Sequence, residues 1–578
     1  MRKKKKKAIS PVLIIIPLIL IVFLFIVGSA LIERYTPSKE RMDLASFYNL
    51  TEESQVAITL NNTVLEDTFA TMIDGHVYLD YKFVRNTINP RFYWDTNENI
   101  LLYTTADNVI SAEADSTTYS IGKSSNDYTR TIVKATATSA WVDIDFVKEY
   151  SDFTYLYFDS PSRLVITNEW KEITVSTLKK DTEVRYKGGI KSPILCDVKK
   201  GDVLTILEVD EKFTKVCTAD GITGYVKSNL VKNTEAQTLV SEYVLEQFNH
   251  IKKEEPINLL WHAIYSTSGN SQISTLLSET KGVNVVSPTW FRIKDNNGNV
   301  QSFASMDYVN YCHSHGVDVW GLINNLEVPG IDTAYVLTHT STRQNLVNQL
   351  VALALQYNLD GINVDIEQIS ESEVYDGYIQ FLRELSIKCE NNDIVLSTDV
   401  YPPASYNNVY RYEQQADFVD YVILMAYDQH YGQQSGEGSV ASLEWVNETV
   451  QNILAKNIPS EQLVLGIPFY SRLWELKPAE DSSEYAYTIK ESELGMTASS
   501  NWMNNNVGED NMIWLDDCGQ WYGEVTYNDT TYKMWLEDAT SIEEKLKLTQ
   551  NYSLAGAAFW KYDLEKASIW DTIIKYIN

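Results

Sequence analysis

The feature that most constrains the fold is a ten-residue stretch, residues 359–368, which reads LDGINVDIEQ. Apolar and polar side chains alternate strictly along it, and a period of two predicts a β-strand. The apolar set is Ile362, Val364 and Ile366, and the polar set is Asn363, Asp365 and Glu367. The stretch therefore predicts a strand with carboxylates on one face and branched aliphatic side chains on the other.

An apolar run at residues 350–355 precedes this strand and predicts a helix. A strand with one polar face that follows a helix suits a barrel whose active site lies at the carboxyl ends of its strands. The alternative is an edge strand with a solvated acidic face. The Ile and Val side chains favour burial on both faces, and two buried carboxylates are costly without a functional role.

The same stretch resembles the sequence motif of family 18 glycoside hydrolases, Asp-x-x-Asp-x-Asp-x-Glu on the fourth strand of a (β/α)8 barrel. Asp360, Asp365 and Glu367 match the motif, and Asn363 stands where most members have Asp. The resemblance implies that Glu367 is the general acid and that Asp365 orients the acetamido group of the substrate. We expect the Asn363 amide to donate a hydrogen bond to Asp365 and to favour its charged form.

Apolar strands alternate with amphipathic helices from residue 256 to residue 578, as in a parallel α/β fold. Besides the motif strand, the expected strands are residues 257–264, 283–287, 317–323, 394–400, 421–425, 463–467 and 554–559. Eight strands in this length predict one (β/α)8 barrel. An insertion, residues 475–538, separates the seventh strand from the eighth.

Polar and aromatic residues gather at the predicted strand ends. Residues 425–428, Met-Ala-Tyr-Asp, match the family's sixth-strand motif, and Trp560 matches the tryptophan at the floor of the sugar subsite. The substrate-binding residues that we predict are Asn363, Asp360, Met425, Asp428, Trp560, Trp290, Asn324 and Tyr401. Glu367, Asp365 and Tyr427 are the predicted catalytic residues.

The resemblance implies a retaining, substrate-assisted reaction on a glycan with an N-acetylated sugar at the cleaved bond, without metal or cofactor. Tyr427 would donate a hydrogen bond to the attacking acetamido carbonyl. The Asn-x-Asp-x-Glu form resembles the branch that contains spore-cortex-lytic N-acetylglucosaminidases, which favours β-1,4 bonds in peptidoglycan. The alternatives are a hydrolase of chitin or other glycans and a non-catalytic carbohydrate-binding surface protein.

The amino terminus predicts a membrane anchor. Residues 1–10 hold six basic residues, and residues 11–32 carry no charge and are long enough to span a bilayer. A cleavable signal peptide is the alternative, but the apolar run is longer than the roughly 7–15 residues of a signal core. The positive-inside rule keeps the basic tail in the cytoplasm. The chain is therefore predicted to be a single-pass membrane protein of the cell membrane, with the part after the helix outside the cell on a Gram-positive-type surface.

Four further segments precede the barrel. Residues 33–55 are expected to be a linker. Residues 56–170 contain a repeat of strand, short helix, strand and strand that resembles the amino-terminal domain of copper amine oxidases. Residues 171–232 resemble a small all-β bacterial Src-homology-3-like barrel, and residues 233–255 are expected to form a linker helix.

Charge and cysteine content restrict the partners. The tail holds six of the 48 basic residues and none of the 78 acidic ones, so the rest of the chain has a formal net charge of −36. Such a surface argues against nucleic acid and anionic lipid as partners. Five scattered cysteines show no metal-binding spacing; isolated thiols are favoured over a Cys196–Cys217 disulfide.

Overall fold

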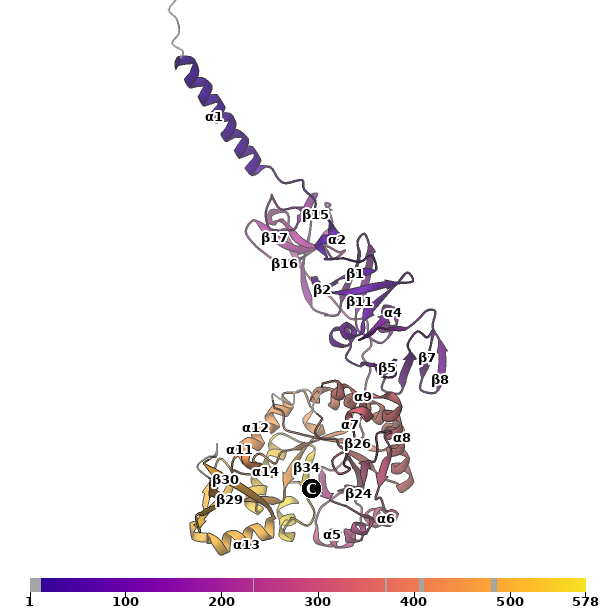
Figure 1. Cartoon of the computed structure of the whole chain (residues 1–578), viewed down its shortest axis with the longest axis vertical. Helices are drawn as coiled ribbons and strands as arrows, with labels where there is room; N and C mark the ends of the chain where they lie inside the picture. The colour runs from indigo at the N-terminus through magenta and orange to yellow at the C-terminus, as the bar shows by residue number, and fades with distance from the viewer. Residues whose placement is uncertain (1–11, 232, 370–371, 405–409, 480–485, 578) are drawn as a thin grey trace, which may run out of the picture. The chain divides into compact units, whose positions relative to one another are not determined.

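The computed structural model describes residues 12–231, 233–369, 372–404, 410–479 and 486–577 (Figure 1). The chain divides into two compact bodies. The first contains Met1–Trp94, Ala112–Tyr119 and Ser125–Leu245, and the second contains Asp95–Ser111, Ser120–Ser124 and Glu246–Asn578. Each body is described by itself below.

The second body is built on a closed barrel of eight parallel strands. They are β20 (Ile257–His262), β21 (Val285–Pro288), β24 (Asp318–Asn324), β25 (Gly361–Asp365), β26 (Val395–Val400), β27 (Tyr421–Met425), β28 (Leu463–Pro468) and β34 (Gly556–Trp560). Neighbours pair in chain order from β24 to β34, β34 pairs with β20, and β21 pairs with both β20 and β24. The predicted barrel is confirmed, with each strand within a few residues of its expected position.

Helices surround the barrel strands (Figure 1). The long ones are α8 (Thr340–Tyr357), α9 (Ser372–Glu390), α12 (Leu443–Leu454) and α14 (Ala539–Asn551). Side chains on both faces of the barrel strands are buried, because one face packs against helices and the other fills the barrel. Burial on both faces explains why most of these strands read as continuous apolar runs.

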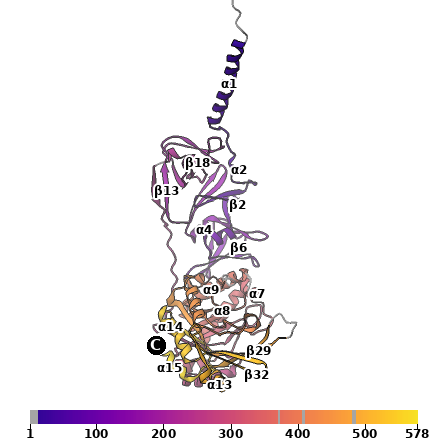
Figure 2. The same cartoon turned by 90° about the vertical axis from the view of Figure 1, so that its left-hand side faces the viewer.

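A second sheet interrupts the barrel between β28 and β34. Its antiparallel strands are β29 (Tyr470–Pro478), β30 (Tyr487–Gly495), β31 (Ile513–Leu515), β32 (Gln520–Tyr527) and β33 (Thr530–Leu536). Helix α13 (Met496–Asn506) lies beside this sheet (Figure 2). Its Met503 shares a small core with Met534. The insertion starts at Tyr470, five residues before the expected boundary, because β29 follows β28 almost without a loop.

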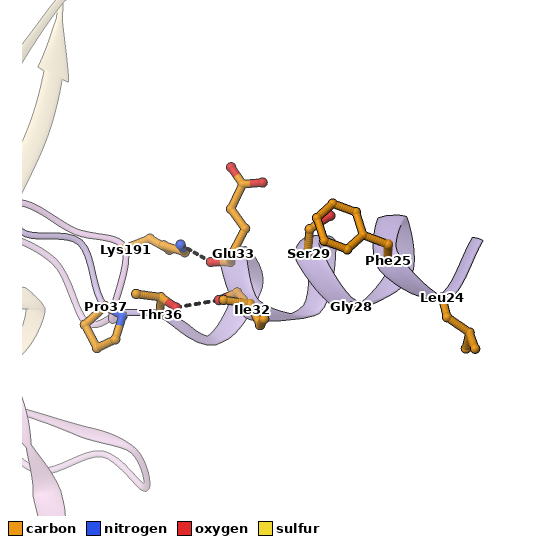
Figure 3. Close-up of a pocket in the computed structure, with 9 residues that line it drawn as sticks. All are labelled: Leu24, Phe25, Gly28, Ser29, Ile32, Glu33, Thr36, Pro37 and Lys191. Atoms are coloured by element: carbon orange, nitrogen blue, oxygen red, sulfur yellow. Dashed lines mark hydrogen bonds between the residues drawn. The ribbon is translucent and has the colours of Figure 1, made fainter. Parts of the chain in front are cut away.

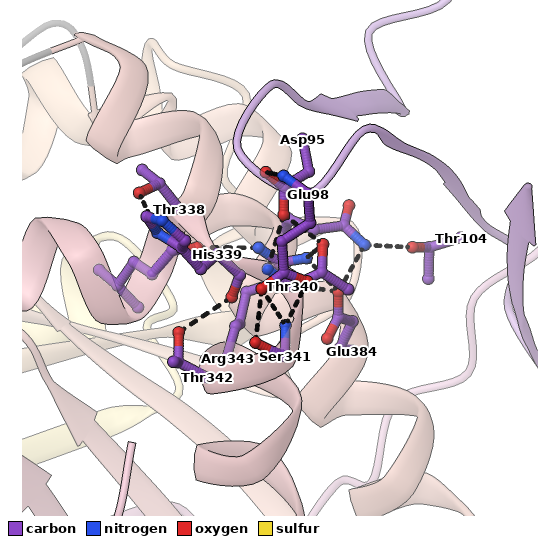
Figure 4. A network of polar contacts seen from close by, with 12 residues as sticks. Asp95, Glu98, Thr104, Thr338, His339, Thr340, Ser341, Thr342, Arg343 and Glu384 are labelled. Carbon is purple, nitrogen blue, oxygen red and sulfur yellow. Dashed lines mark hydrogen bonds and ion pairs between the residues drawn. The ribbon is translucent and has the colours of Figure 1, made fainter. Parts of the chain in front are cut away.

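The turn after Asp95 belongs to the same body as the barrel and binds the start of α8 (Figure 4). The Asp95 carboxylate accepts hydrogen bonds from the Thr340 amide at 2.6 Å and from its hydroxyl at 2.7 Å. The Glu98 carboxylate accepts a hydrogen bond from the Ser341 amide at 3.0 Å. Two acidic side chains therefore satisfy amide groups in the first turn of α8, which lack partners within their own helix.

The predicted repeat is present in the order of the elements. In one copy β3 (His76–Asp80) and α3 (Tyr81–Phe83) precede β4 (Phe92–Asp95) and β5 (Ile100–Thr104). In the other, β10 (Ala140–Asp143) and α4 (Ile144–Glu149) precede β11 (Thr154–Asp159) and β12 (Ser162–Thr167). Asp80 and Asp143, at equivalent places, cap the two short helices through backbone amides.

A seven-stranded sheet follows in the first body. It consists of β13 (Glu172–Thr177), β14 (Thr182–Arg185), β15 (Ile194–Val198), β16 (Val203–Glu208), β17 (Phe213–Cys217), β18 (Thr223–Lys227) and β19 (Thr234–Thr238). Segment 33–55 is not a free linker, because Arg41 forms a β-bridge with Ile194 and Tyr48 is buried in the same core. Burial of apolar side chains fixes a segment that its polar composition alone suggested to be free.

The helix expected at residues 233–255 is absent. Thr234–Thr238 form β19, which pairs with β13, and residues 239–253 contain neither helix nor strand. The Ile251 amide donates to the Asp420 carboxylate at 2.6 Å, and the Lys253 amide donates to the Tyr421 hydroxyl at 2.8 Å. These bonds to barrel side chains stand in place of the backbone hydrogen bonds that the expected helix would have made.

The amino-terminal helix α1 (Val12–Tyr35) contains a stretch, Ile15–Tyr35, that is long and apolar enough to cross a membrane. Its last turns border a hollow of about 580 Å³ that is lined mainly by apolar side chains (Figure 3). The Lys191 ammonium donates to the Glu33 carbonyl there. This hollow contains no pair of carboxylates and is not the candidate catalytic site.

All five cysteines are free thiols.

Candidate active site

A cavity of about 810 Å³ lies at the carboxyl ends of β20, β25, β26, β27 and β34. Seven of the predicted site residues line it: Asp365, Glu367, Tyr401, Met425, Tyr427, Asp428 and Trp560. They come from four strands or the residues just after them. A parallel barrel brings them together because all of its strands end on the same side.

Glu367 lies two residues beyond β25 and is held through its backbone. Its amide donates to the Asn325 side-chain oxygen at 2.9 Å, and its carbonyl accepts from the Asn325 side-chain nitrogen at 2.8 Å. The Tyr401 hydroxyl donates to the Glu367 carboxylate. Gln368 then adopts a left-handed conformation with φ of 56°, so the chain turns away directly after the carboxylate. Backbone and side chain of Glu367 are therefore both fixed.

The surroundings of Glu367 favour a protonated carboxyl. Burial raises its pKa, the Tyr401 hydrogen bond lowers it, and the nearby Asp428 charge raises it, with a net increase. Burial, Glu367 and Asp399 together hold the pKa of Asp365 well above its ordinary value. A carboxyl with a raised pKa can donate a proton near neutral pH, as a general acid must.

Asn363 lies beneath the cavity and is fully buried. Its side-chain oxygen accepts hydrogen bonds from the Trp261 indole and the Ser287 hydroxyl, both at 3.0 Å. Its nitrogen donates to the Asp399 carboxylate at 2.8 Å, and not to Asp365 as the sequence suggested. Residues two apart on one strand are roughly 7 Å apart, whereas adjacent strands are separated by about 4.8 Å, so the cross-strand partner is nearer.

Tyr427 and Asp428 follow β27. Tyr427 is partly buried, and its removal from water is the main reason why the pKa of its hydroxyl lies well above the ordinary value. It therefore remains a hydrogen-bond donor at neutral pH. Asp428 forms an ion pair with Arg472 at 2.9 Å and accepts a hydrogen bond from Tyr470. Arg472 and Tyr470 belong to β29, so the first strand of the insertion borders the site.

Trp560 ends β34 and lies in the cavity beside Trp261, with ring centroids 5.8 Å apart and planes at 63°. Trp445 lines the same cavity. Indole faces bind the apolar faces of sugar rings, so these three side chains give the cavity the composition of a carbohydrate site.

Four predicted substrate-binding residues are not among those that line the cavity. Asn363 is beneath it. Asp360 precedes β25 at the other end of the barrel and accepts hydrogen bonds from the Val319 amide and the His313 ring, both at 2.8 Å. Trp290 is fully buried and donates to Asn270 at 2.8 Å. Asn324 ends β24, where it is buried.

The sequence interpretation missed several residues of the site. Asn325 holds the Glu367 backbone, and the cavity is also lined by Trp261, Asp399, Trp445, Glu448 and Arg472. For Asp399 a signal existed, because it is a carboxylate close to the carboxyl end of the expected strand at residues 394–400, where a barrel carries its active site. No local pattern marks Arg472, whose position depends on the packing of the insertion.

Comparison with known proteins agrees with this arrangement. The model of "Glycosyl hydrolases family 18" matches residues 233–565, more than half of the chain. The uncharacterized glycosylase YvbX of Bacillus subtilis is 22% identical over 326 residues, which cover 54% of this chain and 90% of that protein. The cortical fragment-lytic enzyme of the same organism is 24% identical over 243 residues, 41% of this chain and 54% of that enzyme. The chain thus matches about half the length of the latter.

Among solved structures, the C-terminal domain of a chitinase-like protein from Desulfitobacterium hafniense superposes with a TM-score of 0.50 at 20% identity. The match covers 56% of this chain and 98% of that domain, and it supports the fold alone. Together with the family match over residues 233–565, the closed parallel barrel leads to one conclusion. This chain belongs to glycosyl hydrolase family 18, and it is a glycoside hydrolase related to spore cortex-lytic enzymes and chitinases.

Proposed function

We propose that this protein is a membrane-anchored N-acetylglucosaminidase that cleaves β-1,4 bonds of bacterial peptidoglycan with retention of configuration. The observation that carries the proposal is the position of Glu367, a partly buried carboxyl with a raised pKa, in one cavity with Asp365, Tyr427 and Trp560. This set can protonate a leaving group, bind an acetamido group and stack on a sugar ring.

In the proposed mechanism Glu367 donates its proton to the glycosidic oxygen as the bond to the anomeric carbon breaks. The carbonyl oxygen of the substrate's own acetamido group attacks that carbon and forms a cyclic oxazolinium ion. Asp365 accepts a hydrogen bond from the acetamido N–H and stabilises the positive charge, while Tyr427 donates to the carbonyl oxygen. Water then opens the ring, Glu367 takes its proton, and the original configuration is restored.

Two observations support peptidoglycan as the substrate. The chain resembles cortical fragment-lytic enzymes over its barrel, and α1 is suited to hold the enzyme at a cell surface. The cavity is lined by six carboxylates and one guanidinium, from Arg472, among the described residues. Such a lining favours capture of sugar by stacking and hydrogen bonding over capture of anionic groups.

Chitin is the second candidate, favoured by the similarity to the chitinase-like domain from Desulfitobacterium hafniense. Its polymer contains the same N-acetylglucosaminyl bond, so the mechanism would be unchanged. A non-catalytic sugar-binding protein is disfavoured because Glu367, Asp365 and Tyr427 are all present in one cavity.

The segments before the barrel have proposed roles in placing it. The repeat at residues 56–170, of the type found at the amino terminus of copper amine oxidases, would act as a spacer or weak wall-binding module. The seven-stranded sheet that follows would be a bacterial Src-homology-3-like module for wall peptides. Residues 1–10 would lie in the cytoplasm, with the remainder outside.

The test is digestion of purified peptidoglycan and of chitin by the full chain in mild detergent, followed by borohydride reduction and mass spectrometry. We expect peptidoglycan fragments with N-acetylglucosamine at the new reducing ends, and proton NMR should detect the β-anomer first. Muramic acid at the reducing ends would contradict the assigned bond. Products from chitin alone would favour the second candidate, and no products from either polymer would favour a binding protein.

A further inference from the structure

Asp399, for which neither the family motif nor the sequence assigns a role, lies next to Asp365 on the neighbouring strand. In the pairing of β25 with β26, Asn363 is opposite Ser397 and Val364 is opposite Thr398. The next residues on the two strands are Asp365 and Asp399. Both line the cavity, and parallel strands lie about 4.8 Å apart, so the two carboxyl groups are cross-strand neighbours.

Both carboxyl groups are nearly inaccessible to solvent, with 9% of Asp365 and 3% of Asp399 exposed. Asp399 accepts a hydrogen bond from the Asn363 nitrogen at 2.8 Å. One Asp365 oxygen is buried and has no hydrogen-bond partner among the described residues. Within that part of the chain neither carboxylate forms an ion pair. Two adjacent carboxyl groups without a cation are therefore buried together.

The orientation of Asn363 decides which carboxyl group is favoured as the anion. The indole of Trp261 can only donate, so the atom of Asn363 that it contacts is the oxygen. The Asn363 nitrogen must then be the atom that faces Asp399. A donor that points at Asp399 stabilises its charged form, and no equivalent donor reaches the unpartnered oxygen of Asp365.

The remaining titratable groups around the pair carry no compensating positive charge. Glu367 follows on the same strand as Asp365, Tyr427 follows β27, and Tyr378 lies on α9. The pKa of each of these three groups is raised, mainly by burial. Two close carboxyl groups in such surroundings do not both ionise at neutral pH.

We propose that Asp399 is a positioning residue that shares a single proton with Asp365, in the place of the motif Asp that Asn363 has replaced. This inference rests on the proposed function. In the resting enzyme Asn363 keeps the charge on Asp399, and the proton stays on Asp365. When the acetamido group binds, the Asp365 O–H bond breaks and the proton passes to an Asp399 oxygen. Asp365 is then an anion that accepts the acetamido N–H, and the total charge is unchanged.

The central variant is Asp399→Asn, which preserves size and can still bond to Asn363. It removes the proton acceptor and one negative charge near Glu367. We expect kcat to fall by about tenfold or more. The basic limb of the kcat/KM profile should move to lower pH, because Glu367 and Asp365 lose their proton more easily without a neighbouring carboxylate.

The exchange variant Asn363→Asp/Asp399→Asn returns the second carboxylate to β25 and keeps an amide opposite it. Trp261 and Ser287 can still donate to the new carboxylate at position 363. We expect this double variant to recover most of kcat and the parent's basic limb. A purely structural role of Asp399 would predict two additive losses instead.

The matched control is Asp420→Asn, which makes the same change in another buried carboxyl. The Asp420 carboxylate lies outside the cavity and accepts hydrogen bonds from the amides of Leu396 and Ile251. Burial raises its pKa to about 7. This change should lower the melting temperature and leave the pH profile in place. A profile of Asp399→Asn that overlays the parent's would overturn the proposal.

A measurement without substrate separates this proposal from the assigned reaction. The infrared difference spectrum of parent minus Asp365→Asn at pH 7 should contain the C=O band of a protonated carboxyl. It requires neither turnover nor a folded Asp399→Asn protein. Absence of this band would refute proton sharing even if the enzyme digests peptidoglycan, and its presence would support the pair even if the polymer is another glycan.

Discussion

The Glu367 carboxyl depends on two residues that lie outside its own strand. Asn325 binds the amide and carbonyl of Glu367, and Tyr401 donates a hydrogen bond to its carboxylate. The first contact fixes where the side chain starts, and the second fixes where it points. Such fixed geometry is what allows a single acid to act without reorganisation during the reaction.

Replacing Glu367 by Gln should abolish hydrolysis while leaving the fold and glycan binding in place. The amide has nearly the same shape but no transferable proton, and loss of a general acid costs about a hundredfold or more in rate. Turnover on peptidoglycan, together with binding to undigested wall, would measure the two effects. Activity close to that of the parent would rule out Glu367 as the acid.

Replacing Tyr401 by Phe should move the basic limb of the kcat/KM profile to higher pH. The Tyr401 hydrogen bond lowers the pKa of Glu367, so its removal raises this pKa, and Glu367 then stays protonated to higher pH. Tyr431→Phe is the matched control, since Tyr431 lines the same cavity and is largely exposed. A shift of equal size in both variants would mean that the polarity of the cavity, and not the Tyr401 hydrogen bond, sets the pH profile.

Among the elements, helix α8 is notable because its first turn is capped from elsewhere in the chain. His339 precedes the helix and makes no capping bond with its side chain. The amides of Thr340 and Ser341 instead bind Asp95 and Glu98 (Figure 4). Helix α8 leads directly into β25, so this cap supports the element that comes before the catalytic strand.

Asp95→Ala should destabilise the protein by about 1–2 kcal/mol, the usual cost of a lost helix cap. The Asp95 side chain is buried and also accepts hydrogen bonds from the amides of Asn97 and Glu98. The variant therefore loses the hydrogen bonds within this turn as well. Urea unfolding followed by circular dichroism would measure the change. Asp107→Ala, at an exposed position in the same segment, should stay within about 0.5 kcal/mol of the parent. Equal effects of the two changes would argue against the cap.

For the molecule as a whole, the apolar helix at the amino terminus contrasts with the acidic composition of the remainder. The stretch Ile15–Tyr35 is not buried by any other part of the chain that the structure describes. The remainder is strongly anionic, so electrostatic attraction to anionic lipid would not retain it. Retention at a membrane would therefore depend on hydrophobic insertion.

The protein with α1 should sediment with membranes, resist extraction by high salt and be released by detergent, because retention through α1 would be hydrophobic. Fractionation of expressing cells with immunoblotting would measure this. A variant with two Arg residues in place of Leu20 and Ile21 is the control and should lose membrane retention, since each charge in the bilayer centre costs about 2.5–3.5 kcal/mol. Mature protein in the medium that begins near Leu31 would identify a signal peptide instead.

Local sequence patterns predict the eight strands of the barrel, the order of the elements in the repeat and the residues that meet at the cavity from β25, β27 and β34. Each of these is encoded locally. A period of two assigns side chains to the faces of a strand, and the carboxyl ends of parallel strands necessarily lie on the same side. The family resemblance singled out Glu367, Tyr427 and Trp560, and strand order then places them at the same end of the barrel.

Which side chains become partners depends on tertiary packing. The pairing of β25 with β26 placed Asp399 beside Asp365 and directed Asn363 to Asp399, although these residues are more than 30 positions apart. Barrel side chains accept hydrogen bonds from the amides of Ile251 and Lys253, where the sequence predicted a helix. Contacts of this kind depend on strand register and on the packing of distant segments. Register is set by the burial of a whole strand, and no local pattern carries it.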